Sequence, residues 1–100
     1  MKYKITDVRI GKRAQKQFDK NRQNIEERYG SKVADKYVDD FIGAKEQIKK
    51  TPEHWQESAT TPGARRALFS KYGAFLYRVY TKFIRIVAVY DTRQNKYPKR

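Results

Sequence analysis

The chain has 100 residues, enough for one domain with a modest hydrophobic core and too few for two. It has no cysteine, which excludes disulfides and thiolate metal sites, and no apolar run of membrane-spanning length, so we expect a cytoplasmic protein without a membrane partner. Its 24 Lys and Arg against 11 Asp and Glu give a formal net charge of +13, and such an excess attracts nucleic acid or an acidic protein.

The first predicted element is a strand over residues 3–10, in which Tyr3, Ile5 and Val8 contribute to the core. An isolated strand leaves its backbone groups without hydrogen-bond partners. We therefore expect this strand to join a sheet that forms later in the chain.

Two amphipathic helices are predicted between Lys12 and Thr51. The first ends at Gly30, a residue typical of the position after a helix, and Ser31 is placed to cap the second. Pro52 cannot continue the second helix. Residues at helical spacing form the two apolar stripes, which are Ala14, Phe18, Ile25 and Tyr29, then Ala34, Tyr37, Val38, Phe41, Ile42, Ala44 and Ile48. Helices joined by so short a break form an αα-hairpin, whose shared stripe a sheet must cover.

Residues 51–63 predict a long loop, because they contain two prolines, a glycine and a cluster of Ser and Thr. The single tryptophan, Trp55, lies in this loop, and we expect it to pin the loop to the domain rather than to bind a ligand. The single histidine, His54, is expected to be a surface residue.

Residues 64–93 predict a β-meander, because three segments rich in Val, Ile, Leu, Phe and Tyr are separated by residues 70–73 and by a tight break at residues 82–83. We expect Gly73 to adopt a positive φ in the first turn. Alternation in the middle strand places Leu76, Arg78 and Tyr80 on one face and Phe75, Tyr77 and Val79 on the other. In the last strand it predicts a core face of Ile84, Ile86, Ala88 and Tyr90 and an opposite face of Arg85, Val87, Val89, Asp91 and Arg93.

These elements predict a single α+β domain over residues 1–100 in the order β-α-α-β-β-β, ending in a basic tail at residues 91–100. The small antiparallel sheet should carry the αα-hairpin on one face. The expected core residues are Phe18, Ile25, Tyr37, Phe41, Ile48, Ile84 and Ile86.

The positive charge is concentrated in the second half of the chain. Residues 1–57 carry a net charge of +4, and residues 58–100 carry +9. Without cysteine and with one histidine, the chain offers no zinc site and no nucleophile–histidine triad, and its five glycines form no phosphate-binding loop, so we expect no metal and no cofactor. Arginine, lysine and tyrosine remain as the groups able to hold an anion or move a proton, and the candidates are Arg66, Lys71, Arg78, Arg85, Arg93, Lys96 and Tyr97.

The ordered set of a leading strand, a helical hairpin, a loop and a meander reading RRALF, YGAFLYRV and IRIVAVYDTR resembles the RelE/ParE superfamily of bacterial type II toxins. The RelE branch implies a ribosome-dependent mRNA endonuclease, and the ParE branch implies a DNA gyrase poison without a hydrolytic site. Carried over from the ribonucleases, the resemblance implies catalytic roles for Arg66, Arg93 and Tyr97.

Two positions depart from the ribonuclease pattern. Phe75 and Leu68 stand where the ribonucleases have basic residues, and loss of a transition-state donor costs about 2.7–4 kcal/mol. The resemblance therefore favours the ParE branch, with Lys71, Arg78, Arg85 and Lys96 as target- or nucleic-acid-binding residues. It also implies an acidic antitoxin as partner. The alternatives are an mRNA endonuclease, in which Arg85 or Lys71 replaces the lost donor, and a small basic nucleic-acid-binding module.

Overall fold

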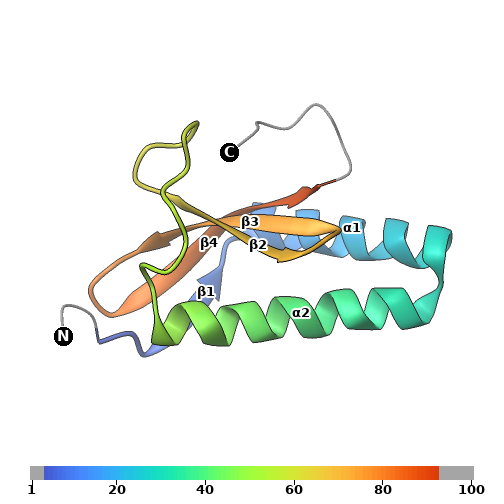
Figure 1. Ribbon diagram of the computed structural model, residues 1–100, viewed down its shortest axis with the longest axis horizontal. Coiled ribbons are helices and arrows are strands. Elements are labelled where there is room, and N and C mark those ends of the chain that lie inside the picture. Colours follow the sequence, from blue (N-terminus) through green and yellow to red (C-terminus); the bar gives the residue numbers. More distant parts are fainter. Residues whose placement is uncertain (1–3, 93–100) are drawn as a thin grey trace.

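The computed structural model describes residues 4–92, and it has the predicted element order. The elements are β1 (Asp7–Ile10), α1 (Lys12–Tyr29), α2 (Ser31–Lys50), β2 (Arg65–Ser70), β3 (Gly73–Val79) and β4 (Phe83–Asp91), as labelled in Figure 1. The four strands form one sheet in the order β1-β4-β3-β2. Residues 51–64 form the predicted long loop between α2 and β2.

The sheet is antiparallel over the meander, as predicted, but mixed as a whole, because β1 pairs with β4 in parallel. The αα-hairpin carries the chain away from the sheet and returns it, so β1 and β2 run in the same direction (Figure 1). β1 is shorter than the predicted strand, although the backbone N–H groups of Lys4 and Thr6 still donate to the carbonyls of Thr81 and Lys82. Tyr3 lies outside the described residues.

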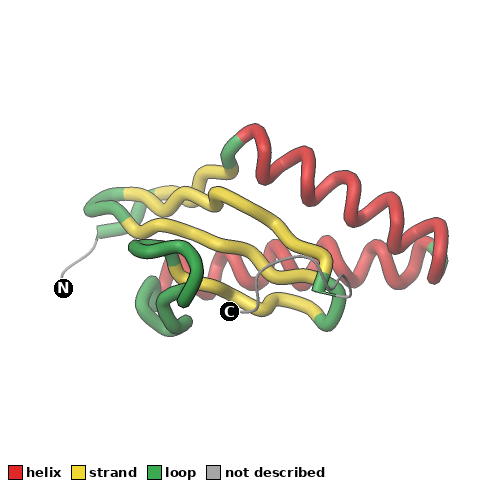
Figure 2. Tube along the Cα trace, turned by 90° about the horizontal axis from the view of Figure 1, so that it is seen from above, coloured by secondary structure: helices red, strands yellow, loops and turns green. Residues whose placement is uncertain are grey.

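Both helices cover the same face of the sheet, and among residues 4–92 the loop between α2 and β2 crosses the other face, which we call the open face (Figure 2). All seven predicted core residues are buried between the sheet and the helices. Packed aromatic rings dominate this layer, with Phe18 stacked on Tyr37 and Phe41 against Phe75.

The breaks at two glycines differ in detail from the sequence prediction. Gly30, with φ +94, both ends α1 and precedes α2, so Ser31 is the first residue of α2 and makes no capping hydrogen bond. Gly73 does not adopt a positive φ; it is the first residue of β3. A Cβ at Gly73 would lie 2.5 Å from the Phe69 ring and 2.9 Å from the Tyr37 ring, so close packing rather than turn geometry requires glycine there.

The predicted faces of the last strand are wrong beyond Ile86. Tyr77 pairs with Ile86 and the preceding Leu76 pairs with Ala88, so β4 carries one extra residue, Val87, as a β-bulge. One extra residue exchanges the two faces of a strand. Ala88 and Tyr90, which we expected in the core, are therefore on the open face, and Val89 and Asp91 are buried on the helix side. Asp91, where we placed the start of the tail, is the last residue of β4.

Candidate functional site

Arginines from three neighbouring strands form a row across the open face. Arg85 of β4 pairs with Arg9 of β1 on one side and with Arg78 of β3 on the other. Side chains directly opposite each other in a sheet lie about 4.5–5.5 Å apart at Cβ, and like charges at that spacing destabilise the pair. An anion bound over such a row would reduce this repulsion.

The contacts of the three arginines differ. Arg78 donates from Nη1 to the Pro62 carbonyl at 3.1 Å, which ties the loop to β3. Arg9 pairs with Asp7 at 3.0 Å and lies 3.9 Å over the Phe83 ring. Arg85 is exposed and makes no hydrogen bond or ion pair within residues 4–92. Its guanidinium is therefore the one in the row that is available to a ligand.

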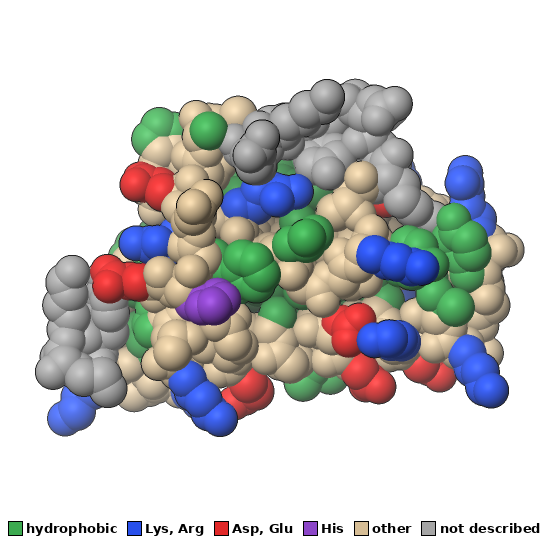
Figure 3. Space-filling view, in the orientation of Figure 1, with side chains coloured by type: hydrophobic (Ala, Val, Ile, Leu, Met, Phe, Trp, Pro, Cys, Tyr) green, Lys and Arg blue, Asp and Glu red, His purple; other side chains and the backbone are tan. Residues whose placement is uncertain are grey.

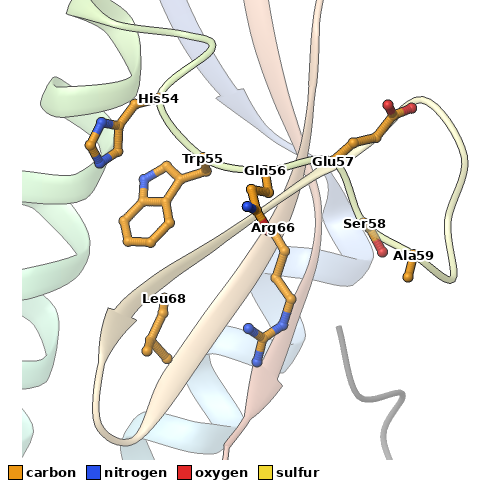
Figure 4. A pocket seen from close by; sticks show the side chains of 8 residues that line it. All are labelled: His54, Trp55, Gln56, Glu57, Ser58, Ala59, Arg66 and Leu68. Atoms are coloured by element: carbon orange, nitrogen blue, oxygen red, sulfur yellow. The ribbon is translucent and has the colours of Figure 1, made fainter.

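A cleft opens beside this row, between β2 and the loop of residues 51–64. Its volume is about 530 Å³, and it is lined by His54, Trp55, Gln56, Glu57, Ser58, Ala59, Arg66 and Leu68 (Figure 4). The loop is held in place by hydrogen bonds. Trp55 Nε1 donates to Gln47 Oε1 at 2.9 Å, Arg65 Nη1 donates to the Trp55 carbonyl at 2.6 Å, and the Tyr77 hydroxyl donates to the Pro52 carbonyl at 2.8 Å. The prediction that Trp55 pins the loop is confirmed.

Arg66 supplies the positive charge inside the cleft. Its side chain lies on the open face of β2, and the Nε atom is buried without a hydrogen-bond partner. A buried hydrogen-bond donor without a partner costs about 1–3 kcal/mol when the group is neutral, and more when the group is charged. Glu57, the acidic residue of the lining, directs its carboxylate away from the cavity and accepts from the Gly63 N–H at 3.0 Å (Figure 4). The cleft therefore contains a positive guanidinium whose Nε donor has no hydrogen-bond partner.

Tyr77 lies below the loop on the helix side of β3 and is fully buried. Burial raises the pKa of its hydroxyl to about 12, although the positive charge of Arg65 acts to lower this pKa. The phenol therefore stays protonated and holds the loop through its bond to Pro52, rather than acting as a base.

The structure brings three of the predicted site residues together on the open face, namely Arg66, Arg78 and Arg85. Lys71 lies apart from them, in the turn between β2 and β3, with its Nζ 5.2 Å from the Tyr72 ring. Arg93, Lys96 and Tyr97 lie outside the described residues. Sequence reasoning missed Arg9, which its alternation with Val8 and Ile10 could have placed on the open face.

Two positions that are basic in the ribonucleases supply no positive charge to the cleft. Phe75, at a position that is basic in the ribonucleases, is fully buried against Phe41, so a side chain there faces the helices and not the cleft. Leu68 lies in the cleft and is 47% exposed. Within residues 4–92 no three His, Asp or Glu side chains come together to hold a metal ion, and neither helix is long and apolar enough to cross a membrane.

Comparison with known proteins adds two findings. A family profile described as "ParE toxin of type II toxin-antitoxin system, parDE" matches residues 8–96. The fold is similar to that of a solved structure described as "Chromosomal ParDE TA system from P. aeruginosa", with 18% sequence identity and a TM-score of 0.73, over 87% of this chain and 96% of that chain. A search of curated proteins found no match.

Proposed function

Because the chain belongs to the ParE toxin family of type II toxin–antitoxin systems, we propose that it inhibits growth in the cytoplasm by binding DNA gyrase. The observation that carries the proposal is the profile match from residue 8 to residue 96, which takes in both helices and the whole meander. Binding without hydrolysis agrees with an open face that carries a row of arginines and with the lack of a basic side chain at Phe75 and Leu68.

The target-binding residues we propose are Arg78 and Arg85 on the open face, with Lys71 at the hairpin turn and Lys96 beyond the described residues. Arg85 is the strongest of these, because it is exposed and has no partner within residues 4–92. An mRNA endonuclease is the less favoured alternative. Arg66 is available to it, but Phe75 is in the core and Leu68 offers no donor.

Gyrase inhibition is tested with the purified full-length protein in a supercoiling assay. We expect supercoiling to be inhibited, and induced expression to stop growth and activate the response to DNA damage. Arg85→Glu should weaken the inhibition, whereas Arg28→Glu, a change of the same charge at an exposed site near the hairpin tip, should not. Normal supercoiling together with rapid transcript cleavage would refute gyrase as the target and leave the family assignment unchanged.

The partner we propose is an antitoxin whose toxin-binding segment is acidic and amphipathic. Charge on such a segment accelerates association more than it slows dissociation. Charge reversal at Arg78 or Arg85 should therefore slow association at low salt and flatten its salt dependence. An unchanged association rate would move the docking site to the helical hairpin.

A further inference from the structure

The cleft beside β2 combines an apolar wall with a positive group. Trp55 and Leu68 both line it, with Leu68 below the Trp55 ring in Figure 4, and the Arg66 side chain lies between these two residues and the far end of the loop. Hydrophobic side chains are exposed next to the histidine, with both basic and acidic side chains around them (Figure 3). A ligand that fits this cleft must offer a flat or apolar group and an anion close together.

Arg66 is the group that most needs a ligand. Its Nε atom is buried without a partner, and no carboxylate within residues 4–92 pairs with its guanidinium. A guanidinium binds a phosphate or carboxylate through paired N–H groups, and it does so most strongly where water is excluded. An anion at Arg66 would therefore satisfy a donor that the chain itself leaves unmet.

Further positive groups continue from the cleft across the sheet. Arg66 pairs with Leu76 of β3, and Arg78 is the next residue of β3 on the same face. Arg85 and Arg9 then follow on β4 and β1. Since strands lie about 4.8 Å apart, this diagonal crosses about 14 Å of the open face. A single anionic group could occupy Arg66, but an array of this length is matched by a chain that repeats its negative charge.

The two features together point to single-stranded nucleic acid. We propose that the cleft binds one unpaired base between Trp55 and Leu68, with a phosphate at Arg66 and the following phosphates along Arg78 and Arg85. Stacking on aromatic side chains beside a basic track is how proteins hold single strands without reading sequence. A duplex cannot enter in this way, because its bases are paired and stacked and their faces are covered. An acidic peptide without aromatic residues, such as poly-glutamate, would supply charge, but it has no planar group to place on Trp55.

The probe for this proposal is a fluorescently labelled 12-residue oligo(dT), titrated with the full-length protein. Because Trp55 is the sole tryptophan, its fluorescence reports directly on the cleft. We expect oligo(dT) to quench Trp55 and to bind at least ten-fold more tightly than a blunt duplex of the same length. A poly-glutamate peptide of similar charge should bind weakly and leave Trp55 fluorescence unchanged. Duplex binding of equal strength, or equal quenching by poly-glutamate, would overturn the proposal.

Charge variants distinguish the cleft from the general basicity of the chain. Each phosphate contact to a single strand contributes about 0.7 to the slope of log K against log salt. The double variant Arg66→Gln/Arg85→Gln should therefore lower the slope by about 1.4. The matched control Arg28→Gln/Lys32→Gln removes the same charge from exposed sites around the hairpin turn and should leave the slope nearly unchanged. An equal loss of slope in the control variant would show that the oligonucleotide binds the net positive charge of the chain and not a defined site.

The proposed site shares Arg78 and Arg85 with the proposed gyrase-binding surface, and only the cleft residues Trp55, Arg66 and Leu68 are its own, so each proposal is judged by its own assay. If the protein binds oligo(dT) but leaves supercoiling normal, the site is retained and gyrase is refuted as the target. If it inhibits supercoiling but does not bind oligo(dT), gyrase is retained and the site is refuted. Leu68→Glu supplies a further check, because it places a negative charge beside the bound base at a side chain that is already 47% exposed. It should abolish Trp55 quenching while circular dichroism shows an unchanged fold, and persistent quenching would place the base elsewhere.

Discussion

The Tyr77 hydroxyl ties the cleft loop to the sheet, and its replacement by phenylalanine should change stability in a pH-dependent way. The ring is fully buried, and the hydroxyl donates to the Pro52 carbonyl at 2.8 Å. Burial raises the pKa of this phenol from 10.0 to about 12. The folded protein therefore keeps the Tyr77 proton over a pH range in which the unfolded chain loses it.

The direction and size of the effect follow from proton linkage. Below pH 10 the phenol is neutral in both states, so Tyr77→Phe costs only the hydrogen bond, about 1 kcal/mol. Above pH 10 the unfolded state is stabilised by ionisation, and folding stability falls by 1.36 kcal/mol per pH unit until the folded-state pKa of about 12 is passed. At pH 11 wild type should have lost about 1.4 kcal/mol of stability relative to Tyr77→Phe. Wild type should therefore be the more stable protein at pH 8, and Tyr77→Phe should be the more stable protein at pH 11.

Urea unfolding followed by Trp55 fluorescence measures this difference at pH 8 and pH 11. Other groups that titrate in this range are common to both proteins, so they cancel when the two free energies of unfolding are subtracted. Tyr80→Phe, at a 42% exposed tyrosine, is the matched control for the loss of a phenol hydroxyl. A difference for Tyr77→Phe that does not change with pH would refute the reasoning.

Four further substitutions test the packing on the two faces of the sheet. Phe75→Ala should cost about 3–5 kcal/mol in urea unfolding, whereas Leu68→Ala should stay within about 0.5 kcal/mol, and similar costs would contradict their assignment to core and cleft. Gly73→Ala should cost about 1–3 kcal/mol, because its Cβ would overlap packed rings, and a thermal midpoint equal to that of wild type would show that the rings can move apart. Gln17→Leu removes the acceptor of the Val89 N–H at 2.9 Å, so it should speed hydrogen exchange at that amide and cost about 1–3 kcal/mol.

Local patterns in the sequence determined the elements and the core. The helical spacing from Phe18 to Ile48 and the breaks at Gly30 and Pro52 are properties of neighbouring residues, so periodicity and backbone sterics were enough to place both helices. The same holds for the alternation of Phe75 and Tyr77 with Arg78. The excess of positive charge in the second half is likewise a property of the amino-acid sequence alone.

Tertiary structure alone decided which residues form the site. The extra residue at Val87 depends on the pairing of β3 with β4, and this pairing moved Ala88 and Tyr90 to the open face. The parallel pairing of β1 with β4 joins residues more than 70 positions apart, and it brought Arg9 to Arg85. The cleft depends on the hydrogen bond from Tyr77 to Pro52 and on the loop that it holds over Arg66. Alternation and helical period describe only neighbours along the chain, so contacts between distant strands and loops are decided by which packing buries the most surface with its polar groups paired.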